Sequence, residues 1–242
     1  MNQPSRTFTV QASEVIPSCA PSGARVRTLL DSGPGLRRHL IDLPAESLLT
    51  GTAAPGGELW FVISGHGWLN AGAGPGLALR PDRGLLLPPG LAYQVSPDPA
   101  DGNELAIDRV GLPEPGADPG SAPAPAVALA RDLTECSVEI TGDRRFRVLF
   151  GPGRDCAVAT AFVGEIPPGR APDHSHPYDE TVLVLGGQGW LHADGEDHPL
   201  RPGTCTRLPP GSVHCLENAG ATTLRVLGVF HPADSPAAKL AQ

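Results

Sequence analysis

The chain has 242 residues, of which 40% are hydrophobic and 18% are charged, so it can bury a core and is not expected to be disordered. Its 30 glycines and 28 prolines lie between short apolar runs, a composition typical of many short strands joined by tight turns. The net charge of -8 argues against a nucleic-acid-binding protein, because phosphate binding needs clustered Lys and Arg.

The sequence contains no apolar run with the length of a signal peptide or a transmembrane helix. The five cysteines are an odd number and include no C-x-x-C pair, so a disulfide framework is not expected. We therefore expect a reduced, cytoplasmic protein without a membrane partner.

The first predicted strands lie in the N-terminal half. Arg25–Leu30 (RVRTLL), Leu59–Leu69 (LWFVISGHGWL) and Leu105–Ile107 are short segments, and the proline-rich turn Pro88–Gly90 lies between the last two. Short apolar or alternating segments that end at Gly, Pro, Asp or Asn predict β-strands rather than helices.

A region of different composition follows. Residues 113–126 (PEPGADPGSAPAPA) are rich in Pro, Ala and Gly and have no apolar periodicity, which is typical of a linker. The candidate helices of the whole chain are Ala124–Asp132 and the tail from Ser235 onward.

The C-terminal half repeats the pattern of the first at an offset of about 120 residues. The sequence therefore predicts two homologous domains, 1–112 and 127–242, joined by the linker 113–126. Short strands at this spacing predict an all-β fold of sandwich or barrel type. The matching segments of the second half are Arg145–Phe150 (RFRVLF), Thr181–Leu191 (TVLVLGGQGWL), the turn Pro209–Gly211 and Leu224–Val226.

Four residues of the second copy form a candidate metal site. His174 and His176 are two positions apart, a spacing that directs both imidazoles to one face of a strand. Glu180 follows after a predicted turn, and His214 lies three residues after Gly211. Three imidazoles and one carboxylate suit Fe2+, Mn2+, Ni2+, Cu2+ or Zn2+, and such a set leaves positions open for substrate, water or dioxygen. An isolated H-x-H pair is usually two surface histidines, so the prediction depends on the complete pattern.

That pattern runs as G-x4-H-x-H-x3-E-x6-G from Gly169 to Gly187 and as G-x5-P-x-G-x2-H-x3-N from Gly203 to Asn218. It closely resembles the two sequence motifs of the cupin superfamily, although the first motif usually has five residues before its first histidine, where this chain has four. The resemblance extends over both copies and therefore over most of the chain. It implies two tandem jelly-roll (double-stranded β-helix) barrels, a bicupin, with the metal ligands facing the interior of the second barrel.

The first copy retains one of the four candidate ligands. Glu58 aligns with Glu180, whereas Thr52, Ala54 and Tyr93 stand at the positions of the three histidines. These side chains do not hold a transition metal in the usual cupin way, so we expect a metal-free N-terminal barrel with a structural role, in packing or in a homodimer. A polar pocket around Glu58 and Tyr93 is the alternative.

Residues that share strand parity with the ligands, one loop residue and one residue of the preceding strand are expected to line the substrate pocket. Most of them are apolar, and the sequence shows no anchoring charge near the site, which argues against substrates such as sugar nucleotides. The expected lining residues are Phe162, Tyr178, Val182, Val184, Ser212 and Leu216.

The resemblance leaves the reaction open, because this fold supports diverse chemistry. The leading hypothesis is an oxygenase similar to quercetin dioxygenase-like cupins, with Fe2+ or Mn2+ favoured, a small enol or phenol as substrate and Glu180 as a proton acceptor. The alternative is an isomerase, cyclase or decarboxylase that uses the metal as a Lewis acid on an enolisable carbonyl. A non-enzymatic ligand-binding cupin is the third hypothesis. The Ala-, Gly-, Pro- and Arg-rich composition favours a bacterial source.

Overall fold

The computed structural model describes residues 6–33, 35–72, 76–114 and 128–237, and this part of the chain is almost entirely β-strand. The all-β prediction is therefore confirmed. The helical segments in the described residues are two short 3-10 helices, Ala12–Glu14 and Leu133–Glu135. None of the described helices is long and apolar enough to cross a membrane.

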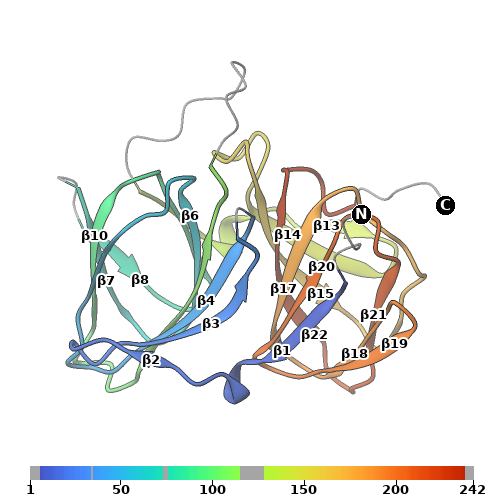
Figure 1. Cartoon of the computed structure of the whole chain (residues 1–242), viewed down its shortest axis with the longest axis horizontal. Coiled ribbons are helices and arrows are strands. Elements are labelled where there is room, and N and C mark those ends of the chain that lie inside the picture. Colours follow the sequence, from blue (N-terminus) through green and yellow to red (C-terminus); the bar gives the residue numbers. More distant parts are fainter. Residues whose placement is uncertain (1–5, 34, 73–75, 115–127, 238–242) are drawn as a thin grey trace. The chain divides into compact units, whose positions relative to one another are not determined.

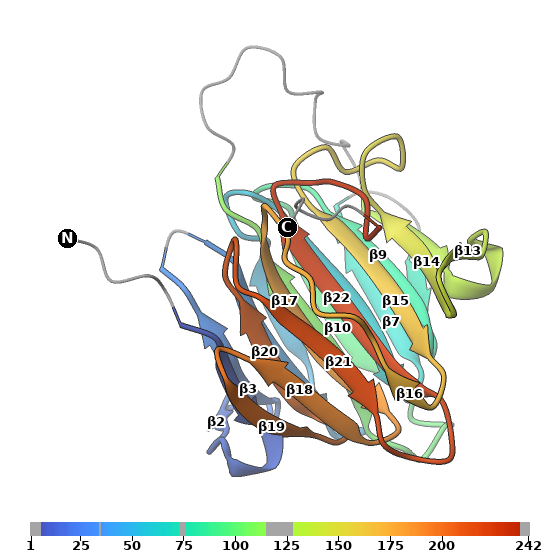
Figure 2. The same ribbon diagram turned by 90° about the vertical axis from the view of Figure 1, so that its right-hand side faces the viewer.

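The chain forms two compact units, and each of them contains one seven-stranded and one four-stranded antiparallel sheet (Figures 1 and 2). The N-terminal barrel comprises the described residues between Val15 and Cys136 together with Asp155–Ala157. The C-terminal barrel comprises Ser137–Arg154, the described residues from Val158 onward and those up to Glu14. Two jelly-roll barrels, as the sequence predicts, are present.

The N-terminal barrel packs its two sheets around one apolar interior. Its seven-stranded sheet has the order β12 (Leu129–Asp132), β9 (Arg83–Leu87), β6 (Glu58–Ser64), β11 (Leu105–Gly111), β4 (Arg37–Leu43), β3 (Arg25–Asp31) and β2 (Ser18–Cys19). Its four-stranded sheet has the order β5 (Leu49–Thr52), β10 (Ala92–Pro97), β7 (Gly67–Ala71) and β8 (Leu77–Leu79).

The C-terminal barrel has the same construction. Its seven-stranded sheet has the order β1 (Phe8–Gln11), β20 (Thr204–Leu208), β17 (Asp179–Gly186), β22 (Leu224–His231), β15 (Thr160–Ile166), β14 (Arg144–Phe150) and β13 (Glu139–Thr141). Its four-stranded sheet has the order β16 (Gly169–Arg170), β21 (His214–Asn218), β18 (Gly189–Ala193) and β19 (Glu196–Leu200).

The internal repeat of the sequence is also present in the strand pairing of the two barrels. Glu58 of β6 pairs with Leu87 on one side and with Gly111 on the other, and Glu180 of β17 pairs with Leu208 and Phe230 in the same way. The two glutamates therefore occupy equivalent places in the two barrels, as the sequence alignment predicts.

The compact units differ from the predicted domains 1–112 and 127–242 at both boundaries. Strand β1 pairs with β20, so the segment before Val15 belongs to the C-terminal barrel. Strand β12 pairs with β9, so residues up to Cys136 belong to the N-terminal barrel. A sheet edge exposes unpaired backbone groups, and in each barrel a strand from a distant part of the chain covers one. Most of the predicted linker 113–126 lies outside the described residues.

The expected helix Ala124–Asp132 is wrong for its described C-terminal part. Leu129–Asp132 is strand β12, and each of its four residues pairs with a residue of β9. The tertiary contact therefore overrides the local preference of an alanine-rich segment.

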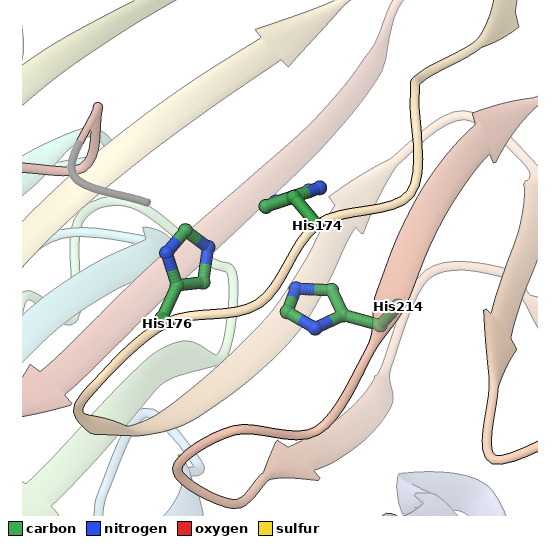
Figure 3. Close-up of side chains that lie close together, drawn as sticks. All are labelled: His174, His176 and His214. Carbon is green, nitrogen blue, oxygen red and sulfur yellow. The ribbon is translucent and has the colours of Figure 1, made fainter. Parts of the chain in front are cut away.

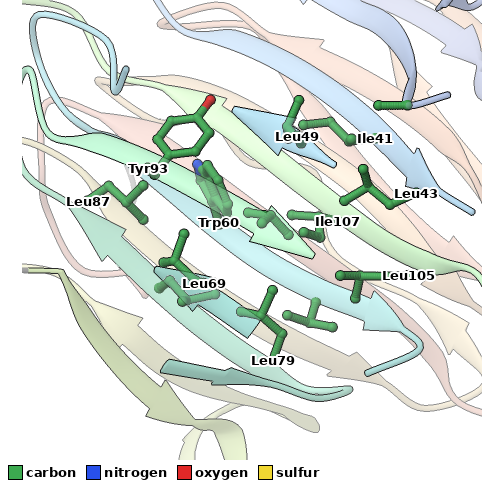
Figure 4. Packing of buried hydrophobic residues seen from close by; sticks show 14 of the residues in the cluster. Ile41, Leu43, Leu49, Trp60, Leu69, Leu79, Leu87, Tyr93, Leu105 and Ile107 are labelled. Atoms are coloured by element: carbon green, nitrogen blue, oxygen red, sulfur yellow. The ribbon is translucent and has the colours of Figure 1, made fainter. Parts of the chain in front are cut away.

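The interiors of the two barrels are filled to different degrees. In the N-terminal barrel a continuous cluster of buried side chains includes Trp60, Leu69 and Tyr93 (Figure 4). Ala24 belongs to the same cluster. In the C-terminal barrel the corresponding apolar cluster adjoins a cavity, and the candidate ligands line that cavity.

Candidate metal centre

Backbone hydrogen bonds hold the two halves of the histidine motif together. The N–H of His174 donates to the carbonyl oxygen of His214 at 3.0 Å, and the N–H of His214 donates to that of His174 at 2.8 Å. Gly211 adopts a positive φ of 78° in the proline-rich turn, and its N–H donates to the carbonyl oxygen of His176 at 2.8 Å. A glycine takes up this conformation without steric cost. The three histidines are therefore positioned by main-chain contacts between β21 and the segment before β17.

The three imidazoles face one another (Figure 3). One ligand atom from each of His174, His176 and His214 lies within 4.8 Å of the other two. The ring centroids are 4.6 Å apart for His174 and His214, 4.8 Å for His174 and His176, and 5.3 Å for His176 and His214. This spacing is suited to three nitrogens that share one metal ion.

Oxygen atoms behind two of the rings fix which nitrogen carries the proton. Nδ1 of His174 is 3.1 Å from the carbonyl oxygen of Pro172, and Nδ1 of His214 is 2.9 Å from that of Ser212. A carbonyl oxygen only accepts, so each Nδ1 is the donor and each Nε2 carries the lone pair that a metal ion needs. Burial lowers the pKa of His214 to about 4, which keeps its imidazole neutral at physiological pH.

For His176, the oxygen atom next to Nδ1 comes from the hydroxyl group of Tyr178. The hydroxyl of Tyr178 donates to the carbonyl oxygen of Ser235 at 3.4 Å, and its oxygen lies 3.0 Å from Nδ1 of His176. Burial raises the pKa of Tyr178 above its usual value, so the phenol stays protonated. With its own proton used on Ser235, the hydroxyl oxygen accepts from Nδ1–H, and Nε2 of His176 carries the lone pair.

Glu180 stands beside this cluster. Its Oε2 lies 3.9 Å from Nε2 of His176, and the carboxyl group is buried at 7% relative exposure. Burial raises the pKa of Glu180 to about 7. A cation at the three nitrogens would favour the ionised form of this carboxyl. In the described residues, the side chains that meet the mutual 4.8 Å distance are the three histidines, with Glu180 adjacent to them.

A cavity of about 200 Å³ opens in front of the cluster. Three of the six expected lining residues, Phe162, Val182 and Leu216, border it together with His174, His176, Glu180 and His214. These three are apolar, so they place hydrophobic surface beside the candidate ligands.

The other three expected lining residues lie elsewhere among the described residues. Val184 packs into the apolar core next to a register shift in β17, beyond the cavity. Ser212 precedes β21, so strand alternation does not apply to it, and its hydroxyl contacts Thr7 and Asp194 at the surface. Tyr178 is buried behind His176, where its ring stacks on Phe230 with a centroid distance of 3.9 Å. Its role is to orient His176.

The cavity lining includes three charged residues that were not predicted from the sequence, Asp143, Arg144 and Arg145. Arg144, at the start of β14, borders the cavity, and its Nη2 donates to the carbonyl oxygen of Leu216 at 2.9 Å. The expectation of a pocket without an anchoring charge is therefore wrong. In the internal repeat, Arg144 directly precedes the segment that matches Arg25–Leu30, so it aligns with Ala24, which is fully buried inside the N-terminal barrel.

In the N-terminal barrel the equivalent place is occupied by polar and aromatic side chains that contact one another. The Glu58 carboxylate accepts from Nε1 of Trp60 at 2.7 Å and from the N–H of Ala54 at 3.2 Å. The Tyr93 ring packs edge-on against Trp60, and its hydroxyl accepts from Arg109 at 2.9 Å.

Strand register refines the alignment of the first copy at one position. Tyr93 pairs with Gly51, as His214 pairs with His174, so Gly51 rather than Thr52 is the structural counterpart of His174. A Cβ at Gly51 would lie 2.5 Å from the Tyr93 hydroxyl. Glycine is therefore needed for the Tyr93 ring to fill the space of a ligand.

Comparison with known proteins agrees with the motif and the fold. Residues 162–230 match the family model described as "Cupin domain". An (R)-mandelonitrile lyase from Granulicella tundricola is 31% identical over 98 residues, which are 40% of this chain and 75% of that protein. The chain belongs to the cupin superfamily.

Two further relatives match shorter stretches of the cupin chain. An oxalate-binding protein from Thermotoga maritima is 34% identical over 68 residues, 27% of this chain and 56% of that protein. An L-ectoine synthase from Mycolicibacterium gilvum is 41% identical over 61 residues, 24% of this chain and 45% of that protein. The chain thus spans about half the length of these two relatives.

Solved structures extend the likeness to both barrels. Protein Ylba from E. coli superimposes with a TM-score of 0.74 at 16% identity, covering 97% of this chain and 95% of that one. A structure of oxalate decarboxylase gives a TM-score of 0.76 at 13% identity, covering 100% and 80%. At such identities the likeness shows the fold, here the tandem cupin fold of the whole chain.

The residues present fit a divalent transition metal ion. Three neutral imidazoles with their lone pairs on Nε2, each oriented by an oxygen at Nδ1, are the arrangement that metal-binding histidines adopt in proteins. The neighbouring Glu180 supplies an anionic oxygen donor. The histidine triad is therefore able to hold a metal ion.

Proposed function

We propose that this cupin is a metal-dependent enzyme that binds one divalent transition metal ion through His174, His176 and His214, with Glu180 as a fourth donor. The observation that carries the proposal is the convergence of three ligand atoms within 4.8 Å at the wall of a cavity. Mixed nitrogen and oxygen donors suit Fe2+ and Mn2+, the metals we favour, as well as Ni2+, Cu2+ and Zn2+.

The reaction class that the site supports best is a non-oxidative one on a small molecule with an enolisable carbonyl, as in a lyase, isomerase, cyclase or decarboxylase. Bound at the triad, the cation would supply Lewis-acid polarisation of a substrate oxygen. Glu180 lies in the cavity wall beside His176, where a carboxylate is placed to accept and return a proton. Similar proteins that bear the names of a lyase, a synthase and a decarboxylase add support.

An oxygenase that acts on an enol or phenol is the second candidate. The apolar side chains of Phe162, Ile166 and Val182 along the cavity favour it, because a dry pocket protects a reactive oxygen species from water. In the non-oxidative reaction and in the oxygenase alike, the chain's residues would orient the substrate and exclude solvent. The two candidate reactions therefore differ in whether they consume dioxygen.

Metal analysis tests the shared part of the proposal. Protein purified without oxygen is expected to contain about one metal ion per chain, and the His176→Ala variant should lose it. His198→Ala is the matched control, since His198 is a surface residue of β19 near Glu196. Full metal content in His176→Ala would refute the site.

Oxygen uptake separates the two reaction classes. Turnover of an enolisable substrate without oxygen consumption would support the non-oxidative reaction. Substrate-dependent oxygen uptake that disappears in His174→Ala would support the oxygenase instead.

A further inference from the structure

Arg144 borders the same cavity of the C-terminal barrel as the candidate metal ligands. Arg144 starts β14, and its guanidinium donates one hydrogen bond, at 2.9 Å, to the carbonyl oxygen of Leu216. Leu216 and His214 are two residues apart on β21, which corresponds to roughly 7 Å along a strand. The guanidinium and the histidine triad therefore lie at two places in one cavity.

The charge of Arg144 has no ion-pair partner within the described part of the chain. Two other arginines of the same sheet are paired: Arg147 contacts Glu165 at 2.9 Å, and Arg207 contacts Asp179 at 2.8 Å. For Arg144, the structure records one hydrogen bond, to Leu216, and through-space attractions from its exposed neighbour Asp143 and from Cys215. Burial lowers the pKa of Arg144 from its usual value, the sign of a guanidinium that has lost part of its hydration.

The two barrels differ at the position of Arg144, just as they differ in the presence of the histidine triad. The equivalent of Arg144 in the N-terminal barrel is Ala24, which belongs to the packed apolar core. The barrel without the histidine triad thus has no guanidinium at this position, and the barrel with the triad has one. An arginine that only supported the fold would be equally useful in both copies.

The guanidinium N–H groups of Arg144 that do not bind Leu216 limit which ligand groups could pair with this residue. Guanidinium N–H groups form a planar fork that matches the two oxygens of a carboxylate. The cavity of about 200 Å³ is below the roughly 300–1,000 Å³ of drug-sized sites, which limits the ligand to a small molecule. A short molecule with a carboxylate at one end and an oxygen at the other can contact both the Arg144 guanidinium and the histidine triad.

We propose that the cavity binds a small organic acid, with its carboxylate on the Arg144 guanidinium and its second oxygen directed at the histidine triad. Arg144 is then the residue that selects acids over neutral molecules. The inference depends on the proposed metal site for the second oxygen, and the experiment below separates the two.

The test uses the metal-loaded full chain and a matched pair of probes, 3-hydroxybenzoate and its neutral amide, 3-hydroxybenzamide. In each probe the hydroxyl group is meta to the carbonyl group on one ring. Isothermal titration calorimetry should show tighter binding of the acid than of the amide by at least about tenfold, the effect of one charge-assisted hydrogen bond. Equal Kd values for acid and amide, or no binding of the acid, would overturn the inference.

Variants assign the preference to the residue. Arg144→Gln should weaken binding of the acid at least about tenfold and change that of the amide less than about twofold. Arg144→Lys, which keeps the charge and loses the fork, should give an intermediate Kd. Arg201→Gln, the same change of charge at an exposed arginine of the C-terminal barrel outside the cavity lining, is the control and should bind as the wild type does.

Metal content distinguishes this inference from the proposed function. If Arg144→Gln retains its metal and its acid preference, the carboxylate site is refuted and the metal site stands. If the wild type takes up no metal, the proposed function fails, and an acid preference that persists without metal and disappears in Arg144→Gln would leave the carboxylate site standing alone.

Discussion

The Tyr178 ring lies parallel to the His176 imidazole, with centroids 4.7 Å apart, and its hydroxyl oxygen is 3.0 Å from Nδ1 of that histidine. The tyrosine is therefore the group that sets the tautomer and the orientation of one candidate ligand. Its position behind the ligand, outside the described cavity lining, makes its contribution separable from substrate contact.

Tyr178→Phe should lower metal affinity about tenfold while the protein stays folded. The change keeps the stacked ring and removes the acceptor of the Nδ1 proton, and loss of such a partner typically costs 10–100-fold in metal affinity. Competition with a chromogenic chelator measures the effect. Tyr93→Phe is the matched control, because the chain has two tyrosines and Tyr93 lies in the N-terminal barrel. Equal losses in both variants would contradict the role of Tyr178.

Deletion of residues 1–14 should destabilise the C-terminal barrel, although it removes only the start of the chain. Strand β1 covers the edge of β20, and Gln11 adds bonds to Pro202 and Thr204. We expect the Tm of this barrel to fall by roughly 5–10 °C, which corresponds to a few kcal/mol in a domain of this size. A synthetic peptide of residues 6–14 should restore part of the loss. An unchanged Tm would show that the edge strand is dispensable.

His39 predicts a pH dependence of the N-terminal barrel. Burial and the nearby charges of Arg109 and Arg37 lower the pKa of His39 to about 4, against the opposing attraction of Asp31. The unfolded chain, with a pKa near 6.5, binds the proton more readily, so the free energy of unfolding falls as the pH drops from 6.5 to 4 and is fully retained above that range. The loss should be about 1–3 kcal/mol, allowing for the partial exposure of the ring. Urea denaturation of wild type and His39→Asn over this range tests it, and identical slopes would contradict it.

The sequence predicted the cluster of His174, His176 and His214 because both motifs are complete and in order, although His174 and His214 are 40 residues apart in the chain. H-x-H spacing and the turn at Gly211 are read directly from neighbouring residues, and the backbone bonds between His174, His176 and the second motif arise from those segments. The correspondence of Glu58 with Glu180 followed in the same way from the repeat, which strand register preserves.

Features that depend on contacts between distant segments could not be predicted. Nothing in the composition of Phe8–Gln11 shows that it covers β20, because any exposed edge of suitable length accepts such a strand. Arg144 was missed because parity was counted only along the motif strands, while β14 enters the cavity from another part of the sheet. Tyr178 was placed in the pocket from its proximity in sequence, and its orientation is decided by the stacking on Phe230.

Gly228→Ala should impair the cavity through a side chain that the sequence did predict to line it. Gly228 of β22 pairs with Phe162 of β15, and a Cβ at Gly228 would lie 2.2 Å from the Phe162 ring. The ring has to shift, which should lower the free energy of unfolding by about 1–3 kcal/mol and weaken binding of 3-hydroxybenzoate to the metal-loaded protein. Gly186→Ala is the control, since a Cβ there meets no atom within 4 Å. Denaturation and calorimetry of the two variants test this, and equal behaviour would show that Phe162 does not shape the site.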